Sequence, residues 1–483
     1  MDPKHFSGFR EITDSFRDRS GAALLYESGG VLTTMSYPAL LAKIERAAAG
    51  LRSDGLAGTP DLIFPESDPG TVVRIFADVL AGRDLLLADP SVPRAAAEAV
   101  LKKLAAETAP FDGASRVLFF TSGTTSRSRT VILTDRSLAE SAYSGQCMLA
   151  CGEGDVILSM LPLSHVFGFV CGMLWGLAYG AAIALGRGLR HLIDDALYFR
   201  PTILPAVPSM IDALIRFDRL NPELRTALIG AAPLSEQSVR LLQEKGTAVY
   251  LGYGLTETSS GIAITQDQSD PYALYPCPGA DIRVEPDGEV SVATPCMMEG
   301  YLGEGFPAPA GIPHAIGDSA QNVPGGGAAP STPRRFYTGD IGVVDENGIL
   351  RLTGRKKDIL VLSDGTKIFC PEYEADLAKL LGTAELAVCL FRGRPVLVVG
   401  EAGGPQGNTQ AGRQGDASGS LQALKKRMEN ILAEYNRALP RSRQLTDVLC
   451  IGRPLPRTPI GKLRRWELQE MLERGEADQS VSQ

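Results

Sequence analysis

The residues that most clearly suggest chemistry form a hydroxyl-rich loop that follows an apolar run. The loop TSGTTSRSR, residues 121–129, comes directly after VLFF, residues 117–120. A strand that leads into Ser, Thr and Gly offers backbone N–H groups and hydroxyl donors to a polyphosphate, and Arg127 and Arg129 add positive charge. The spacing of a Walker loop, G-x-x-x-x-G-K-[ST], is absent. The run therefore indicates either a phosphate site of another kind or a solvated turn.

A second candidate is the basic segment PRTPIGKLRR, residues 456–465. Its proline and glycine residues predict a turn. Taken alone, such a turn is equally typical of a solvated tail.

The two segments belong to an ordered set of seven motifs. The other five are PLSH at 162–165, GAAPL at 230–234, GYGLTET at 252–258, YTGD at 337–340 and GRKKD at 354–358. In order and spacing, the set resembles the signatures of the adenylate-forming superfamily of acyl-CoA synthetases, adenylation domains and luciferases. The resemblance runs from about residue 115 to 470. It is greatest for AMP-forming fatty-acid–CoA ligases, which the segment GRKKDILVLSDGTKIFCPEYE, residues 354–374, also resembles.

The resemblance implies an enzyme that activates a medium- or long-chain fatty acid with ATP. The products would be acyl-AMP and pyrophosphate, and the acyl group would then pass to the thiol of coenzyme A. Mg²⁺ is the implied metal. The thiol could instead be the phosphopantetheine arm of an acyl carrier protein, loaded with an acyl or aryl acid by a stand-alone adenylation enzyme. A non-catalytic nucleotide-binding relative is a third alternative, which the retention of Lys462, Glu257 and Asp340 speaks against.

The resemblance also assigns roles at the reacting phosphate. Two anions must approach each other while pyrophosphate leaves, so cations aimed at the developing charge lower the barrier most. Lys462 matches the catalytic lysine that bridges the carboxylate and the α-phosphate. Glu257 matches the Mg²⁺ ligand, since Mg²⁺ is commonly held by one carboxylate plus substrate phosphates. Thr256 would reach a phosphate.

The remaining assignments concern adenosine and the acid. Tyr253 would stack on adenine, and Asp340 and Arg355 match ribose contacts. His165 matches the histidine that borders the acyl pocket, with Gly168 and Gly172 beside it, although a lone histidine after an apolar run is more often structural. The implied nucleotide-binding set is Thr121, Ser122, Gly123, Thr124, Thr125, Arg129, Ala231, Ala232, Gly252, Tyr253, Gly254, Thr256, Asp340, Arg355 and Lys462.

The phosphate loop departs from the family pattern, which usually has Gly, Pro, Lys and Gly where this chain has Ser126, Ser128, Arg129 and Thr130. Ser126 restricts the loop because a side chain disfavours positive φ. Arg129 keeps the positive charge of lysine but is planar and larger. We expect ATP binding to survive these changes.

The elements that must position these residues have the pattern of an α/β fold. Residues 117–120, 226–230 and 247–251 are predicted strands, and residues 235–245 a helix between the last two. This βαβ unit would place the loop GYGLTETSS at the carboxyl end of a strand, where open α/β sheets bind ligands.

Residues 166–186 carry no charge and have Gly168, Gly172, Gly176 and Gly180 at every fourth position. Length and glycine spacing both match a membrane span. We favour a buried helix and strand, because nothing else in the chain is typical of a membrane protein. Glycines on one helix face would leave room for a ligand.

The fold class expected is α/β, with a large multi-sheet domain at residues 1–356 and a small, mobile α+β domain at residues 357–483. By resemblance, Lys357 is the hinge between them. Residues 303–334 and 401–420 are rich in Gly, Pro and Ala and predict loops. Asn347-Gly348 predicts a hairpin turn, and an apolar stripe from Leu421 to Tyr435 predicts a helix that ends by Pro440.

The composition agrees with an ordinary globular protein. Of 483 residues, 44% are hydrophobic and 22% are charged, and the net charge of −8 argues against a nucleic-acid partner. The eight cysteines show no CxxC spacing, which is typical of buried thiols in a reducing compartment. The N-terminal residues lack the apolar stretch of a secretory signal, so we expect a cytoplasmic protein without a transmembrane segment.

Overall fold

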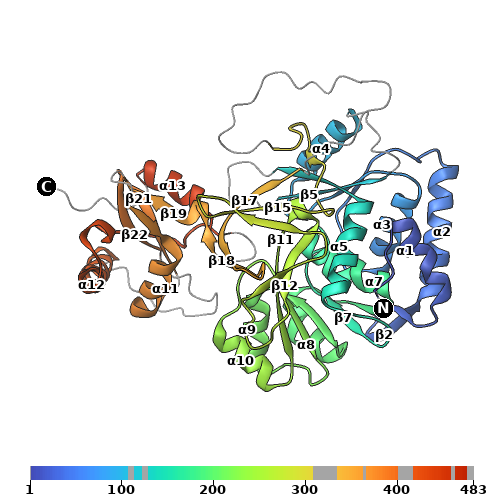
Figure 1. Cartoon of the computed structure of the whole chain (residues 1–483), viewed down its shortest axis with the longest axis horizontal. Coiled ribbons are helices and arrows are strands. Elements are labelled where there is room, and N and C mark those ends of the chain that lie inside the picture. The colour runs from blue at the N-terminus through green and yellow to red at the C-terminus, as the bar shows by residue number, and fades with distance from the viewer. Residues whose placement is uncertain are drawn as a thin grey trace. The chain divides into compact units, whose positions relative to one another are not determined.

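The computed structural model describes residues 2–106, 114–121, 129–307, 334–362, 366–383, 385–400, 417–457 and 463–475. They form two compact units, which we describe separately (Figure 1). The first contains residues 2–121, 129–338 and 342–352, and the second contains residues 339–341 and 353–475, with the gaps just given. Within these ranges, every helix is too short or too polar to span a bilayer.

One sheet of thirteen strands dominates the described part of the chain. Its order is β14-β15-β17-β18-β13-β12-β11-β10-β9-β7-β8-β1-β2. The strands are β1 (Ala22–Ser28), β2 (Val31–Ser36), β7 (Val156–Ser159), β8 (Ala182–Leu185), β9 (Ile203–Ala206), β10 (Thr226–Ile229), β11 (Ala248–Leu255), β12 (Ser260–Thr265), β13 (Leu274–Pro276), β14 (Asp281–Val284), β15 (Glu289–Ala293), β17 (Phe336–Val344) and β18 (Leu350–Arg355). The run from β8 to β11 is parallel and largely apolar, as expected of strands covered on both faces.

A second sheet has the order β16-β6-β5-β4-β3. Its strands are β3 (Asp61–Ile63), β4 (Leu85–Leu87), β5 (Arg116–Phe120), β6 (Thr130–Thr134) and β16 (Gly300–Tyr301). The predicted strand at residues 117–120 is confirmed as β5. Because β6 returns antiparallel to β5, the two strands bring the ends of the predicted phosphate loop together.

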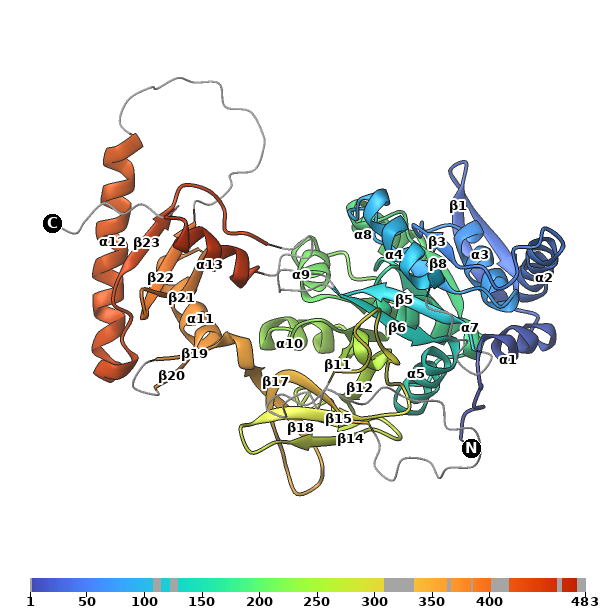
Figure 2. The same ribbon diagram turned by 90° about the horizontal axis from the view of Figure 1, so that it is seen from above.

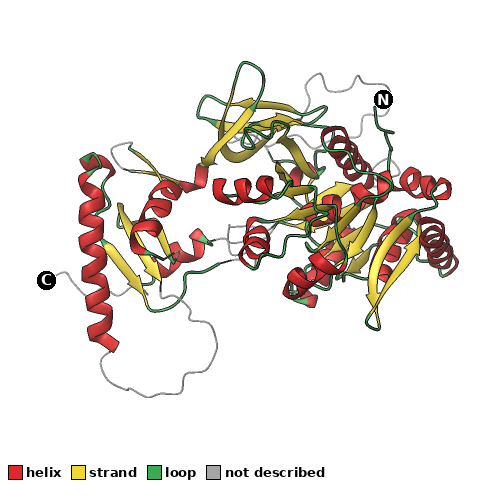
Figure 3. Cartoon of the chain, turned by 90° about the horizontal axis from the view of Figure 1, so that it is seen from below, coloured by secondary structure: helices red, strands yellow, loops and turns green. Residues whose placement is uncertain are grey.

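Helices pack on the strands of both sheets (Figure 3). Those of the first unit are α1 (Phe9–Asp14), α2 (Tyr37–Ser53), α3 (Pro69–Leu80), α4 (Arg94–Ala106), α5 (Asp135–Met148), α6 (Val166–Phe169), α7 (Trp175–Tyr179), α8 (Leu192–Tyr198), α9 (Pro208–Arg216) and α10 (Glu236–Glu244). The start of α3 follows from the sequence: the carboxylate of Asp68 caps this helix by accepting from the N–H groups of Gly70 and Thr71.

The uncharged segment at residues 166–186 is a buried helix followed by a buried strand, as predicted. Helices α6 and α7 are joined by a π-helical turn, Val170–Leu174, and the chain then reverses at Gly180 into β8. At Gly176, a Cβ atom would lie 2.7 Å from Cδ1 of Ile157 and 2.6 Å from Cδ1 of Ile183. Glycine there allows the helix to approach the sheet closely.

The predicted βαβ unit is confirmed as β10, α10 and β11, with β10 and β11 parallel. One boundary was wrong. Strand β11 does not stop at Leu251 but continues to Leu255, because its second half pairs antiparallel with β12. Tyr253 and Gly254 therefore lie in a strand, and only the residues after Leu255 turn.

The second unit is α+β. Figure 2 shows a three-stranded sheet, β21 (Leu386–Phe391), β22 (Arg394–Gly400) and β23 (Val448–Ile451), with helices around it. The helices are α11 (Cys370–Leu381), α12 (Ala417–Arg437) and α13 (Arg465–Glu473), and a small hairpin joins β19 (Ile359–Val361) to β20 (Lys367–Phe369). The predicted apolar stripe lies on α12, where Met428 and Leu432 are buried in the unit's core.

The predicted turn at Asn347-Gly348 joins β17 to β18. Gly348 has a φ of 79°, and its N–H donates to the carbonyl of Asp345 at 3.0 Å. Residues 308–333 and 401–416, which make up most of the two predicted loops, lie outside the described residues.

Candidate nucleotide-binding site

The ends of the predicted phosphate loop are joined by hydrogen bonds. The N–H of Thr121 donates to the carbonyl of Arg129 at 2.9 Å, and the N–H of Arg129 donates to Oγ1 of Thr121 at 3.1 Å. These bonds extend the β5–β6 pairing by one step. Ser122, Gly123, Thr124 and Thr125, which the sequence assigns to phosphate binding, lie outside the described residues.

The chain turns sharply where β10 ends. Gly230 lies against the ring of Phe167, and a Cβ atom there would be 2.8 Å from Cε1 of that ring. Ala231 has a φ of 68°, a left-handed conformation that non-glycine residues adopt rarely and at functional sites more often than elsewhere. Ala231 and Ala232 are both exposed at this carboxyl edge of the sheet. This edge is where the sequence predicted backbone contact with adenine.

Strand β11 leads from this edge to a short turn, Thr256–Thr258, which contains Glu257 and is called the acidic turn below. Tyr253 is 7% exposed and belongs to the main hydrophobic core, so its ring packs at the end of the strand. At Gly254, a Cβ atom would be 1.7 Å from the carbonyl oxygen of Ser260, so only glycine allows this approach of β12. Gly252 pairs with Ile264. The stacking of Tyr253 on adenine stays a prediction.

Thr256 and Glu257 lie in a short 3₁₀ turn, Thr256–Thr258, between β11 and β12. The hydroxyl of Thr258 fixes the turn: it accepts from the N–H of Leu255 at 3.0 Å and donates to the carbonyl of Ser260 at 2.9 Å. The turn leaves both Thr256 and Glu257 half-buried.

The carboxylate of Glu257 has a partner that the sequence did not indicate. The hydroxyl of Tyr301 donates to Oε1 of Glu257 at 2.8 Å, and the N–H of Met298 donates to the carbonyl of Glu257, also at 2.8 Å. Burial, followed by the charge of Glu257, raises the pKa of Tyr301, so its phenol is neutral and can donate. Tyr301 lies 44 residues after Glu257 and has no motif that marks it.

Arg129 contacts the ring of Tyr301. Its guanidinium carbon is 4.7 Å from the centroid of the Tyr301 ring, and its Nε is 3.3 Å from Oε2 of Glu304. Arg129, Tyr301 and Glu257 thus form a continuous series of contacts, all within the first unit, from the end of the phosphate loop to the acidic turn.

Glu257 has the chemistry of a magnesium ligand. Across the described ranges, no three His, Cys, Asp or Glu side chains gather closely enough to hold a metal ion by themselves. A half-buried single carboxylate suits Mg²⁺, which usually takes one or two protein carboxylates and completes its octahedron with phosphates and water.

His165 precedes α6 and is largely enclosed. Burial lowers its pKa, although the nearby charge of Asp89 acts in the opposite direction, so the ring is neutral at pH 7. Asp89 also accepts a hydrogen bond from the hydroxyl of Ser164 at 3.4 Å.

The glycines after His165 pack against the chain. A Cβ atom at Gly168 would be 2.4 Å from the carbonyl oxygen of Pro162, and one at Gly172 would be 3.3 Å from Oγ of Ser159. Glycine at these two positions therefore lets the helix pack closely against residues 159–162. The roles of His165, Gly168 and Gly172 in an acyl pocket stay predictions.

The two predicted ribose ligands are paired in the second unit. Nε of Arg355, at the end of β18, lies 2.9 Å from Oδ1 of Asp340, in β17. Asp340 is only 4% exposed, and this ion pair orients its carboxylate. Their contact with ribose stays a prediction.

The predicted catalytic lysine, Lys462, lies outside the described residues, but the segment's two ends are held together. Arg457 and Leu463 form an antiparallel bridge, and the N–H of Arg464 donates to the carbonyl of Pro456 at 2.8 Å. Lys357, the predicted hinge, lies in the 3₁₀ turn Lys356–Asp358.

The chain is similar to known proteins over much of its length. Residues 111–302 match the model of the family described as AMP-binding enzyme. The 3-[(3aS,4S,7aS)-7a-methyl-1,5-dioxo-octahydro-1H-inden-4-yl]propanoyl:CoA ligase of Mycobacterium tuberculosis is 28% identical over 481 residues, which cover 95% of this chain and 82% of the relative. The 2-succinylbenzoate–CoA ligase of a Geobacillus species is 28% identical over 387 residues, covering 76% and 70%. A long-chain-fatty-acid–CoA ligase, FadD15 of Mycobacterium bovis, is 27% identical over 310 residues, covering 52% and 48%.

Solved structures share the fold. ATP-bound MatB from Rhodopseudomonas palustris matches with a TM-score of 0.73 at 22% identity, covering 97% of this chain and 99% of that one. The O-succinylbenzoate coenzyme A synthetase MenE from Bacillus subtilis, in complex with ATP and a magnesium ion, matches with a TM-score of 0.69 at 21% identity, covering 95% and 99%.

Proposed function

We propose that this chain is an ATP-dependent acid–CoA ligase of the AMP-binding enzyme family, which its similarity to such proteins supports. The carboxylate of the acid attacks the α-phosphorus of ATP, the bond to pyrophosphate breaks, and an acyl-adenylate forms. The thiol of coenzyme A then attacks the acyl carbon, and AMP leaves. The observation that carries this proposal is the contact series Arg129–Tyr301–Glu257, which joins the end of the phosphate loop to the acidic turn.

At the triphosphate, positive charge and hydrogen-bond donors act on the oxygens that gain charge as pyrophosphate leaves. Arg129, Thr256 and the loop at residues 121–125 bind phosphate oxygens, and Lys462 bridges the acid's carboxylate and the α-phosphate. Glu257 holds Mg²⁺, which neutralises phosphate charge when bound. Ala231, Ala232, Gly252, Tyr253 and Gly254 surround adenine in this proposal, and Asp340 with Arg355 holds ribose.

The second half of the reaction uses the small C-terminal domain. We place the boundary between residues 356 and 357, with Lys357 as the hinge. In one orientation Lys462 serves adenylation, and in the other residues 354–365 face the incoming thiol. Rotation at one backbone position is a common way to give one site two tasks.

For the acid, we propose a medium- or long-chain fatty acid, with a ring-bearing acid as a second candidate. The motif resemblance and the relative named as a long-chain-fatty-acid–CoA ligase support the first. The names of two more extensively aligned relatives, a 2-succinylbenzoate ligase and an octahydroindenyl-propanoyl ligase, favour the second. We also propose that the enzyme is cytoplasmic.

Exchange of labelled pyrophosphate into ATP, measured against a panel of acids, tests the adenylation step. The panel contains fatty acids of graded length, 2-succinylbenzoate and ring-bearing propanoates. We expect exchange that depends on the acid, and a loss of about 10²–10³-fold in Lys462→Ala. Exchange with none of the acids, or exchange unchanged in Lys462→Ala, would contradict the proposal.

The acceptor is tested in the same reaction. Adding coenzyme A should give acyl-CoA and AMP, detected by mass spectrometry. If only an added acyl carrier protein became acylated, the enzyme would instead be a stand-alone adenylation enzyme.

A further inference from the structure

Tyr301 is held rigidly between the two charged groups of the proposed triphosphate site. Its strand, β16, pairs antiparallel with β6, so that Tyr301 lies opposite Val131, two residues after Arg129. Beyond it the chain folds back at once: the N–H of Tyr301 donates to the carbonyl of Gly305 at 2.9 Å, and the N–H of Gly305 donates to the carbonyl of Tyr301 at 3.0 Å. With 5% of its surface exposed, Tyr301 has a fixed backbone and a packed ring.

The hydroxyl of Tyr301 fixes the direction of the Glu257 carboxylate. Its O–H donates to Oε1 at 2.8 Å, within the normal range of an O–H···O hydrogen bond. A carboxylate oriented through Oε1 presents Oε2 as the oxygen for a cation.

The ring of the same residue supports Arg129. The guanidinium lies over the aromatic face at 4.7 Å from the centroid, within the range of a cation–π contact. The side chain of Arg129 is 51% exposed, and its ion pair with Glu304, 55% exposed, is weak in water. The buried ring of Tyr301 therefore provides a fixed surface against which the exposed guanidinium of Arg129 packs.

We infer that Tyr301 is a positioning residue that couples the two halves of the triphosphate site, its hydroxyl aiming Glu257 at the metal and its ring aiming Arg129 at the phosphates. This inference rests on the proposed function. It adds a residue to that function, because Tyr301 lies in none of the seven motifs that assign roles to the others. It also gives a physical reason for arginine at position 129, since a planar guanidinium covers an aromatic face better than a lysine ammonium does.

The role of the Tyr301 hydroxyl is tested by Tyr301→Phe, which removes the hydroxyl and keeps the ring. Calorimetric titration of ATP at a series of Mg²⁺ concentrations, with no acid present, measures the metal requirement of binding. We expect the Mg²⁺ concentration for half-maximal enhancement of ATP binding to rise about tenfold, as when an outer-shell partner of a metal ligand is lost. ATP binding in excess EDTA should not change.

The matched control is Tyr179→Phe, which also removes a phenol hydrogen bond, from the Tyr179 hydroxyl to the carbonyl of Lys4 at 2.9 Å. It should leave the metal requirement unchanged. The ring is tested by Tyr301→Leu, which should additionally weaken ATP binding in EDTA by about threefold. In an Arg129→Ala background, Tyr301→Leu and Tyr301→Phe should bind metal-free ATP equally.

The outcomes separate this inference from the proposed function. If wild-type protein binds ATP with Mg²⁺ but Tyr301→Phe has the same metal requirement as Tyr179→Phe, the role of Tyr301 is wrong and the function stands. Equal metal-free ATP affinity of Tyr301→Leu and Tyr301→Phe, with Arg129 present, would overturn the ring's role. If the wild-type protein binds no ATP with or without Mg²⁺, the function and this inference both fail.

Discussion

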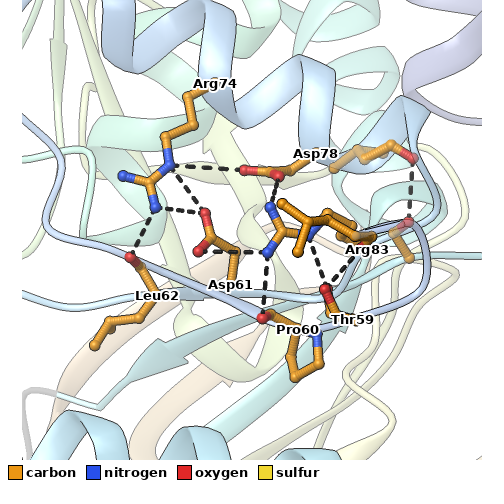
Figure 4. A network of polar contacts seen from close by, with 10 residues as sticks. Thr59, Pro60, Asp61, Leu62, Arg74, Asp78 and Arg83 are labelled. Atoms are coloured by element: carbon orange, nitrogen blue, oxygen red, sulfur yellow. Dashed lines mark hydrogen bonds and ion pairs between the residues drawn. The ribbon is translucent and has the colours of Figure 1, made fainter. Parts of the chain in front are cut away.

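Asp78 and Glu257 are both carboxylates of the first unit, but their surroundings differ. Asp78 lies on α3 and is fully buried. The guanidinium of Arg83, whose side chain is only 8% exposed, donates to Asp78 and also approaches Asp61 at 3.6 Å (Figure 4). Arg74 reaches the same two aspartates from a side chain that is 51% exposed. Glu257 is instead half-buried beside a neutral phenol. Asp78 thus serves the fold, whereas Glu257 retains an oxygen for a ligand.

We predict that Arg83→Met destabilises the protein by about 3–5 kcal/mol at pH 8, because it leaves the buried carboxylate of Asp78 without its nearest counter-charge. Burial and the neighbouring Asp61 raise the pKa of Asp78 to about 6 even with Arg83 present. Removing Arg83 raises it further, so protonation of Asp78 should recover part of the loss as the pH falls from 8 to 5. Urea unfolding at both pH values measures the difference.

The control is Arg74→Met at the exposed end of the same network, which should cost less than about 1 kcal/mol. A loss for Arg83→Met that is equal at pH 8 and pH 5 would contradict the assignment of the cost to Asp78.

The helical segment after His165 has glycine at every fourth position, and these glycines contact different parts of the chain. Spacing every fourth residue matched a membrane span, and the structure places these glycines against other parts of the chain. Gly168 meets the carbonyl of Pro162, and Gly176 meets the side chains of Ile157 and Ile183. Gly176 lets α7 pack closely on the main sheet, and Gly168 lets α6 pack on the segment that follows β7, which sets the position of His165 at the start of α6.

We therefore predict that Gly168→Ala destabilises the protein by about 1–3 kcal/mol, since its methyl group would overlap the Pro162 carbonyl. Gly145→Ala on α5 is the matched control. No atom lies within 4 Å of a Cβ atom built there, so alanine should stabilise that helix by about 0.5–1 kcal/mol. Thermal denaturation of both variants checks the sign, and a stabilised Gly168→Ala would show that the helix is not packed so closely.

At the scale of the whole molecule, the proposed function requires two units with different tasks. The first unit contains Glu257, Tyr301 and Arg129, and the second contains Asp340, Arg355 and the segment that leads to Lys462. Near Lys357, Asp358 accepts from Nε of Arg465 at 2.7 Å, so the turn after the proposed hinge is tied to the start of α13. A rotation at Lys357 would then move α13 together with that turn.

For the hinge, we predict that Lys357→Pro separates the two half-reactions. Proline fixes φ near −65°, so the chain can no longer take two backbone conformations at this position. Either pyrophosphate exchange or thioester formation should fall by at least about tenfold, while the other is largely kept. Lys357→Ala, which leaves the backbone free, is the control, and equal losses of both half-reactions in Lys357→Pro would rule out a hinge role.

The chain's local patterns were enough to predict the α/β class, the βαβ unit of β10, α10 and β11, the buried nature of residues 166–186 and the family resemblance. Each of these depends on residues near one another in sequence, through periodicity, turn residues or a motif's internal spacing. The motif order also predicted that Glu257 and Arg129 serve one site.

Contacts between distant residues were decided only by the tertiary structure. Tyr301 meets Glu257 because β16 pairs with β6, and β11 runs on to Leu255 because β12 supplies a partner for its second half. Gly168 of α6 packs against Pro162, and Gly176 of α7 packs against Ile157 and Ile183 of the main sheet. Strand pairing and side-chain packing join segments far apart in the chain, and no local pattern of residues encodes which segments will meet.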